Sequence, residues 1–205
     1  METIFLIGIG IFSVSALYFL ATHKITFNTA FLVSLVTIAS YLVMYEGTFV
    51  TAESTTSEAV YYTRWLFYAL SCSLLMYEIG RSLKLDKGSI ATLIYLIVVV
   101  MITGALAAVY EGTAMLSMFV VSSVAYAALL YKIFAAKSKN KAFVLKYILV
   151  GWTTFPVVFL FAPEGYALIT ASTAATLYLL LDVFTKIIFY IEGDSAKHGT
   201  LARTN

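Results

Sequence analysis

The sequence predicts an all-α membrane protein: a bundle of seven transmembrane helices with the N-terminus outside the cell and the C-terminus in the cytoplasm. The first observation behind this prediction is composition, because 61% of the 205 residues are hydrophobic and only 12% are charged, about half the charged share of a soluble domain. The second is that the apolar residues form seven long stretches, and the third is that acidic and basic residues lie between different pairs of stretches. An ordinary cytosolic enzyme, a disordered region and a nucleic-acid-binding protein are excluded.

Each stretch is close to the length of about 20 residues that a helix needs to cross the hydrocarbon core of a bilayer. Helices satisfy all their backbone hydrogen bonds within lipid, and no alternation of apolar and polar residues over about ten positions suggests a barrel instead. In chain order, the expected spans are Thr3–Leu20, Thr26–Tyr45, Glu58–Leu83, Ser89–Tyr110, Thr113–Ala135, Ala142–Phe161 and Gly165–Ile191.

The ends and connections complete this organisation. The first stretch has no basic leader and no small-residue cleavage site, so we expect it to remain as a span and not to be removed as a signal. The connections are short except for residues 46–57, where the β-prone segment Gly47–Thr51 allows a small hairpin. We expect residues 1–192 to form the bundle and residues 193–205 to form a short cytoplasmic tail.

Charged residues outside the spans separate by sign. One side of a seven-span arrangement holds glutamates without any lysine or arginine, namely Glu2, Glu46, Glu53, Glu58, Glu111 and Glu164. The other side holds the basic residues Lys24, Arg81, Lys84, Lys87, Lys132, Lys137, Lys139, Lys141, Lys146, Lys197 and Arg203. The positive-inside rule assigns the basic side to the cytoplasm. A single cysteine, Cys72, and two histidines, His23 and His198, provide neither a disulfide framework nor a metal cluster.

Four ionisable residues fall inside the expected spans, two on the third span and two on the seventh. They are Arg64, Glu78, Asp182 and Lys186. Charged groups within lipid are costly and usually mark a transport pathway, a proton relay or the counter-ion of a ligand. We therefore expect the functional residues on these two helices.

Asp182 and Lys186 are four residues apart, so they lie one turn apart on the same helical face. A buried lysine favours its neutral amine, which is nucleophilic and can form a Schiff base with a carbonyl compound. A protonated Schiff base needs a nearby anion, and Asp182 is placed to supply it. An ordinary ion pair, with Lys186 extending toward the membrane surface, is the open alternative.

The third span carries a stripe of candidate residues. The stripe begins at Arg64 and continues 3, 7 and 14 positions later with Phe67, Ser71 and Glu78. Arg64 lies toward the outer end, and Glu78 lies about 21 Å away near the cytoplasmic mouth. The open alternatives make Arg64 an interfacial anchor and Glu78 a partner of Arg81.

Aromatic residues mark the sixth span. Trp152, Phe155 and Phe159 recur on one helical face beside Pro156, which frees a backbone carbonyl and permits a kink. Such a stripe fits either a ligand wall or ordinary helix packing. Three further side chains are expected to face the same interior: Tyr41, Tyr68 and Cys72.

Together these segments resemble the microbial (type 1) rhodopsins, seven-helix proteins that carry retinal on a lysine of the last helix. The resemblance covers nearly the whole chain. The matching segments are Leu181–Lys186 in the last helix, Trp152–Phe159 in the sixth, the loop Phe161–Gly165, Arg64–Ser71 in the third, and Asp86–Ile90 with Gly104 in the fourth.

Departures from the family pattern point to one branch. Outward proton pumps carry a carboxylate three residues after the arginine, where this chain has Phe67; the next position is Tyr68 in place of tryptophan, and Ser73 replaces a proline. An outer glutamate that some relatives use for proton release corresponds to Ala174. The combination of Phe67, Ser71 and Glu78 is similar to the F-S-E triplet of the schizorhodopsins, an archaeal branch described as light-driven inward proton pumps.

The resemblance implies a set of roles. It implies all-trans retinal bound covalently to Lys186 as a protonated Schiff base, with Asp182 as counterion and Arg64 supporting it. The implied proton pathway comprises Phe67, Ser71, Cys72 and Glu78, and the implied retinal pocket comprises Tyr41, Tyr68, Gly104, Trp152, Phe155, Pro156 and Phe159. The implied partners are the lipid bilayer and protons, the chain is expected to be no enzyme, and the family suggests a homotrimer.

Two alternatives to an inward proton pump stay open at this point. A sensory microbial rhodopsin would share every retinal residue but would signal through a partner protein. A membrane scaffold or carrier without a chromophore would show no visible absorption after retinal is added.

Overall fold

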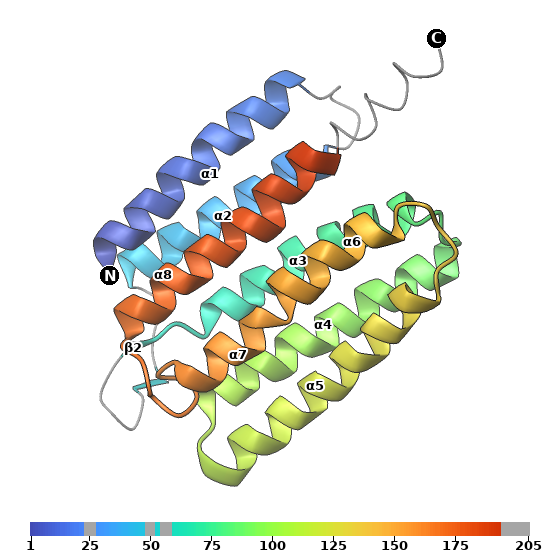
Figure 1. Ribbon diagram of the computed structural model, residues 1–205. Helices are drawn as coiled ribbons and strands as arrows, with labels where there is room; N and C mark the ends of the chain where they lie inside the picture. The colour runs from blue at the N-terminus through green and yellow to red at the C-terminus, as the bar shows by residue number, and fades with distance from the viewer. Residues whose placement is uncertain (23–27, 48–51, 54–58, 194–205) are drawn as a thin grey trace.

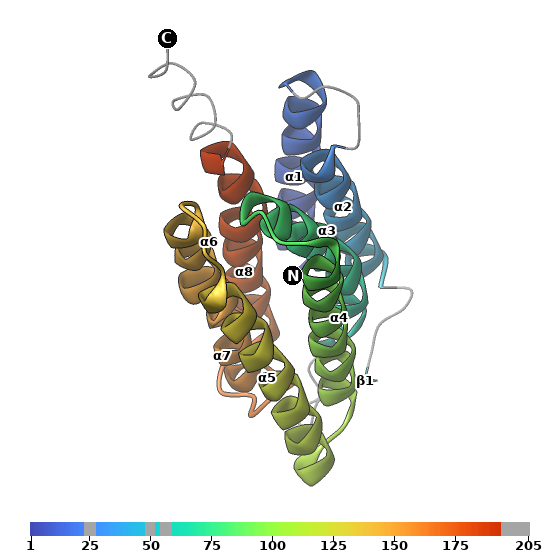
Figure 2. The same cartoon turned by 90° about the vertical axis from the view of Figure 1, so that its right-hand side faces the viewer.

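The computed structural model places long helices side by side, with a two-stranded hairpin at one end (Figures 1 and 2). It describes residues 1–22, 28–47, 52–53 and 59–193. The elements are α1 (Glu2–Thr22), α2 (Thr29–Glu46), β1 (Ala52–Glu53), β2 (Ala59–Val60), α3 (Thr63–Ser82), α4 (Lys87–Val109), α5 (Gly112–Ala135), α6 (Lys141–Tyr147), η1 (Ile148–Trp152), α7 (Thr154–Phe161), α8 (Ala171–Asp182) and η2 (Val183–Ile188). The segments η1 and η2 are π-helical.

The predicted seven-helix architecture is confirmed within the described residues. The run α6–η1–α7 forms one continuous helix, and α8–η2 continues to Gly193 as another. Six helices in this part of the chain are long and apolar enough to span a membrane, which makes the chain a multi-pass membrane protein. The seventh is α3, whose hydropathy is lowered by Arg64, Glu78 and Arg81 and which packs between α2 and α4 (Figure 1).

Three expected spans begin later than the sequence suggested, and the first of them is α2, which starts at Thr29 and not at Thr26. The last helix, α8, starts at Ala171 and not at Gly165, because the residues that follow α7 fold back onto α7. In this turn, the Tyr166 and Leu168 amides donate to the carbonyls of Leu160 and Phe161, each at 2.8 Å. The third helix starts at Thr63 because the residues before it form β2.

A hairpin is present in the long connection, but its ladder lies beyond the predicted β-prone segment. Ala52 pairs with Val60 and Glu53 with Ala59 in antiparallel register. Several residues used for the predicted hairpin, the charge pattern and the tail lie outside the described residues: His23, Lys24, Thr48–Thr51, Glu58, Lys197, His198, Arg203 and the remainder of residues 194–205.

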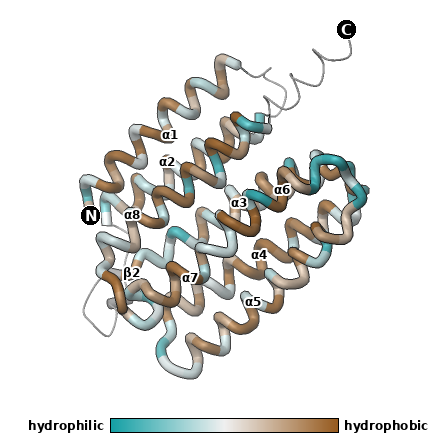
Figure 3. Tube along the Cα trace, in the orientation of Figure 1, coloured by the Kyte–Doolittle hydropathy of each residue, from teal (hydrophilic) through white to brown (hydrophobic). Residues whose placement is uncertain are grey.

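Short polar side chains start three of the helices. Asn28, Asp86 and Thr170 each accept a hydrogen bond from the backbone amide three residues later, which satisfies a donor that the first helical turn leaves free. Between such ends the helices are apolar along most of their length, and hydrophilic residues gather where α5 connects to α6 (Figure 3). Within the described part of the chain, the buried charged residues are Arg64, Asp182 and Lys186, which belong to the candidate site.

Candidate functional site

Lys186 and Asp182 form a buried ion pair. The lysine Nζ lies 2.7 Å from Asp182 Oδ1, and the two side chains are 2% and 1% exposed. Since Lys186 is enclosed, it does not extend to the membrane surface, although the ion pair of that alternative is present. The two groups attract as charges, but their mutual orientation is not that of a well-aligned hydrogen bond.

The second carboxylate oxygen of Asp182 is held by two tyrosines from other helices. The hydroxyls of Tyr41 on α2 and Tyr68 on α3 donate to Asp182 Oδ2 at 3.0 and 2.9 Å. Lys186 Nζ also lies 4.1 Å from the centre of the Tyr68 ring. Asp182 is therefore positioned by three contacts, and Tyr68 touches both members of the ion pair.

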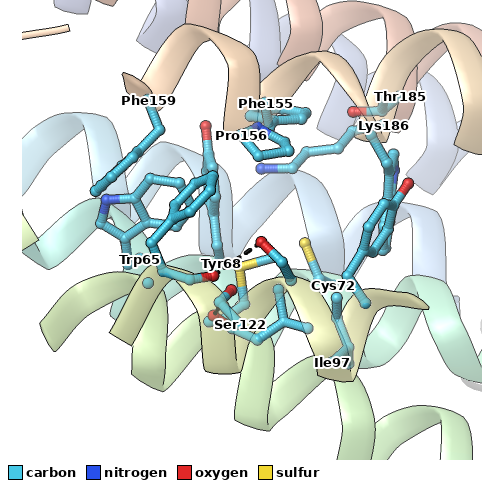
Figure 4. A pocket seen from close by; sticks show the side chains of 17 residues that line it. Trp65, Tyr68, Cys72, Ile97, Ser122, Phe155, Pro156, Phe159, Thr185 and Lys186 are labelled. Carbon is cyan, nitrogen blue, oxygen red and sulfur yellow. Dashed lines mark hydrogen bonds between the residues drawn. The ribbon is translucent and has the colours of Figure 1, made fainter. Parts of the chain in front are cut away.

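A cavity extends from Lys186 between the helices (Figure 4). Lys186 and Thr185 lie at one end of the view, and Trp65 and Phe159 lie at the other. Six of the residues that the family resemblance assigned to a retinal pocket line it: Tyr68, Gly104, Trp152, Phe155, Pro156 and Phe159. Cys72 lines it as well, whereas Tyr41 does not and instead contacts Asp182.

The sequence reasoning missed several lining residues: Trp65, Ile97, Val100, Met101, Phe119, Ser122, Ser123, Tyr126 and Thr185. One of them carried a usable signal, because Trp65 precedes Tyr68 and Cys72 by three and seven positions and so shares their helical face. Trp65 also explains the fourth-helix glycine. A Cβ on Gly104 would lie 3.2 Å from the Trp65 ring, so any side chain there would press on this wall.

Two π-helical segments meet beside the cavity. In η1 the Thr153 amide donates to the carbonyl of Ile148, five residues earlier. Pro156 lacks the N–H that would bond the carbonyl four residues before it, so the sequence permits this break in the α-helical pattern. The other segment, η2, contains Thr185 and Lys186. The two segments pack closely because Gly151 has no side chain: a Cβ there would overlap Thr185 Cγ2.

Replacing Gly151 with Ala is therefore expected to destabilise the protein by about 1–3 kcal/mol, the usual result of overfilling a packed interior. The added methyl group must displace Thr185, the neighbour of Lys186. Thermal unfolding of the purified protein measures the effect. Gly10→Ala is the matched control, because no atom lies within 4 Å of a Cβ at Gly10. Equal stability of the two variants would contradict the close packing of η1 and η2.

Arg64 is buried at the end of the bundle that carries the hairpin. It is 4% exposed, which does not fit an interfacial anchor. Its guanidinium carbon lies 4.3 Å above the Tyr178 ring, and the Tyr178 hydroxyl donates to Glu164 Oε1 at 2.9 Å. Among the described residues no hydrogen bond or ion pair joins Arg64 directly to Asp182. Arg64 instead lies near Tyr41 and Tyr68, the two tyrosines that donate to Asp182.

The remaining third-helix candidates do not share one environment. Ser71 is 1% exposed. Phe67 is half-buried and lines a separate groove with Val43 and Leu70 at the bundle surface, away from the cavity. Glu78 is half-buried near the opposite end from Arg64, where it accepts a hydrogen bond from Thr29 on α2 at 3.4 Å.

Comparison with known proteins places this architecture in a family. Residues 1–191 match the family model described as bacteriorhodopsin-like protein. The structure superposes on the crystal structure of schizorhodopsin 4 with a TM-score of 0.90 and 36% identity, over 94% of this chain and 97% of that chain. The proton pumping rhodopsin AR2 from the marine alga Acetabularia acetabulum shares the fold, with a TM-score of 0.87, 20% identity and coverage of 98% and 96%.

Sensory rhodopsin-2 of Natronomonas pharaonis is 27% identical over 149 residues, which are 67% of this chain and 62% of that protein. The chain thus spans less than two thirds of this curated relative. Proteins of the bacteriorhodopsin-like family bind retinal and are light-driven ion pumps or sensors. With residues 1–191 matched by the family model and 94% of its length by a solved relative at 36% identity, this chain belongs to the bacteriorhodopsin-like family of microbial rhodopsins and is schizorhodopsin-like.

Proposed function

We propose that this chain is a light-driven inward proton pump that binds all-trans retinal covalently through Lys186, with Asp182 as the counterion of the protonated linkage. The observation that carries the proposal is the buried ion pair at one end of an aromatic cavity, in which Lys186 Nζ both lines the cavity and lies 2.7 Å from Asp182 Oδ1. An enclosed lysine with an anion beside it is what a buried protonated linkage requires.

The lining of the cavity suits a flat apolar polyene. Trp65, Tyr68, Trp152, Phe155 and Phe159 supply aromatic faces along it, and such faces pack well against an extended apolar group. Gly104 keeps the wall open, since a Cβ there would lie 3.2 Å from Trp65. Retinal bound at Lys186 would supply a light-driven change of shape that alters the direction of the N–H bond at Nζ.

The surrounding residues set the starting state. Asp182 Oδ1 balances the charge on Nζ, and the two tyrosine hydroxyls on Oδ2 stabilise the carboxylate. Arg64, which lies near Tyr41 and Tyr68, adds positive electrostatic potential. Asp182 therefore acts in this proposal as the counter-charge of Nζ.

The proposed direction of transport rests on the family resemblance, in which outward pumps carry a carboxylate at the position of Phe67. Phe67 carries no proton-accepting group, whereas Glu78 lies toward the opposite end of α3 from Arg64. Basic residues such as Arg81, Lys84 and Lys87 cluster near the Glu78 end, which the positive-inside rule assigns to the cytoplasm. A proton that leaves Nζ toward Glu78 would therefore move inward, and Ser71 and Cys72 lie on α3 between Arg64 and Glu78. Reprotonation from the outside completes the cycle.

The sign of the light-induced pH change tests this proposal. Illuminating a suspension of expressing cells supplied with retinal is expected to make the medium more alkaline, and a protonophore should abolish the change. Acidification of the medium would contradict inward transport. A coloured protein that moves no protons would contradict pumping and support the sensory alternative, to which the 27% identity with sensory rhodopsin-2 gives weight.

A further inference from the structure

The cavity that contains Lys186 reaches the surface of the bundle between α5 and the sixth helix. Ser123 on α5 lines the cavity and is also exposed on the surface of the bundle. Every other described residue that lines the cavity is buried or half-buried. The wall of the cavity is therefore one side chain thick at Ser123.

Side chains join α5 to the sixth helix at two levels beside the cavity. The backbone of α5 approaches the sixth helix most closely at α6, which does not line the cavity. Beside the cavity, the rings of Phe119 and Phe159 stack with their centres 5.6 Å apart, which we call the aromatic contact. The hydroxyls of Tyr126 and Thr153 share a hydrogen bond at 3.0 Å, which we call the hydroxyl contact.

A small side chain lies between these two contacts on each helix. Ser123 follows the α5 member of the aromatic contact by four positions and precedes the α5 member of the hydroxyl contact by three, so it shares their helical face. Pro156 lies midway between the corresponding members on the sixth helix, and it also lines the cavity. We call the space at Ser123 and Pro156, bounded by the two contacts, the lateral window.

The lateral window faces the hydrocarbon of the membrane. Exposed side chains near it on both helices are apolar: Val120 and Val124 on α5 are 51% and 65% exposed, and Val157 on the sixth helix is 47% exposed. Such a surface lies in lipid in a multi-pass membrane protein. A molecule that dissolves in lipid therefore meets the window directly, without crossing water.

The two ends of the cavity are less suited to admit an apolar molecule. Beyond Trp65, the space is filled by Tyr178 and by the Arg64 guanidinium over its ring, and displacing a buried cation is costly. At the end near Lys186, η1 and η2 pack so closely that a Cβ on Gly151 would overlap its neighbour in η2. The route with the fewest obstacles is therefore the side of the bundle.

We infer that retinal enters the protein from the lipid bilayer through the lateral window, an inference that rests on the proposed function. The apolar aldehyde passes between Ser123 and Pro156 and reaches Lys186 along the aromatic lining of the cavity. Tyr126 and Thr153 are positioning residues in this inference, since their hydrogen bond ties the two helices together at one edge of the window.

The rate at which the retinal-free protein takes up retinal from a bilayer tests this route. Protein expressed without retinal is reconstituted in phosphatidylcholine vesicles and mixed with vesicles of the same lipid that carry all-trans retinal. Growth of the visible band measures the covalent attachment. Quenching of tryptophan fluorescence measures arrival in the cavity, because the two tryptophans of the chain, Trp65 and Trp152, both line it.

Replacing Ser123 with Phe is expected to slow both signals by about tenfold, while the final absorbance stays nearly unchanged. The phenyl ring fills the window and must move aside before each molecule enters, which raises the barrier to uptake. Val124→Phe is the matched control, because Val124 is the next residue, is 65% exposed and does not line the cavity. The control should take up retinal at the rate of the unsubstituted protein.

Replacing Tyr126 with Phe gives a test in the opposite direction. Loss of the hydroxyl removes the hydrogen bond to Thr153 and loosens one edge of the window, so uptake should become faster by about threefold. Faster uptake cannot result from misfolding, so this variant decides the matter if Ser123→Phe does not fold.

Three results would count against these expectations. Equal uptake rates in Ser123→Phe and Val124→Phe would overturn the lateral route, as would a lower final absorbance of Ser123→Phe at an unchanged rate, because Ser123 would then be only a part of the cavity wall. Uptake by Tyr126→Phe that is no faster than in the unsubstituted protein would overturn the role of the hydroxyl contact. Failure of the unsubstituted protein to develop any visible band would overturn the proposed function itself.

Discussion

Replacing Lys186 with Ala is expected to give a protein that stays colourless when all-trans retinal is added, with complete loss of the visible absorption band. Lys186 is the lysine among the described residues that lines the cavity, so its removal leaves the cavity without an amine to form the covalent link. The variant also leaves Asp182 as a buried charge without its cation, which costs about 3–5 kcal/mol in folding stability. Absorption spectra after reconstitution, together with thermal unfolding, measure both effects.

The matched control for this variant is Lys146→Ala. Lys146 is half exposed and pairs with Glu192 at 3.0 Å near the end of the bundle, away from the cavity. The control should develop full colour. A visible band in Lys186→Ala would show that retinal is held elsewhere, and circular dichroism at low temperature distinguishes loss of the attachment site from loss of the helical fold.

Replacing Glu78 with Gln is expected to reduce inward proton transport by about tenfold or more, while the visible spectrum stays nearly unchanged. Glu78 does not line the cavity, so its replacement leaves the retinal surroundings intact. The amide that replaces the carboxylate cannot accept a proton, and it also alters the hydrogen bond from Thr29. The initial rate of the light-induced pH change, divided by the amount of pigment, measures the loss.

Arg81→Gln separates a role in transport from a simple charge pair. Arg81 is exposed and lies 5.7 Å from the centre of the Tyr77 ring, one turn from Glu78. If Glu78 served only to pair with Arg81, the two substitutions would have similar effects. We expect near-normal transport from Arg81→Gln, and full transport by Glu78→Gln would contradict a function in proton release.

The helices and the buried charges could be predicted from sequence because both depend on composition. Apolar stretches of about 20 residues have few alternatives to spanning a membrane. Arg64, Asp182 and Lys186 stood out because lipid makes charges rare, and the structure buries all three. The same reasoning identified α3 as a helix although its hydropathy is too low for a span by composition.

The contacts between helices could not be predicted from the sequence, because they depend on how each helix is rotated about its axis. The hydrogen bonds from Tyr41 and Tyr68 to Asp182 join residues separated by 141 and 114 positions, and the spacing of residues along one helix cannot predict contacts between helices. A π-helical segment changes the hydrogen-bond spacing by one residue; Pro156 gave a sequence signal for this beside η1, whereas η2 contains no proline. The outward-facing position of Phe67 likewise depends on the exact rotation of α3.

The three-way attachment of Asp182 has a mechanical consequence. Its backbone belongs to α8, while its carboxylate receives hydroxyl groups from α2 and α3, so one side chain ties three helices together. A change in the charge or direction of this carboxylate loosens two inter-helix ties at the same moment. A change of charge at Lys186 that turns the Asp182 carboxylate would therefore act on α2, α3 and α8 at the same time.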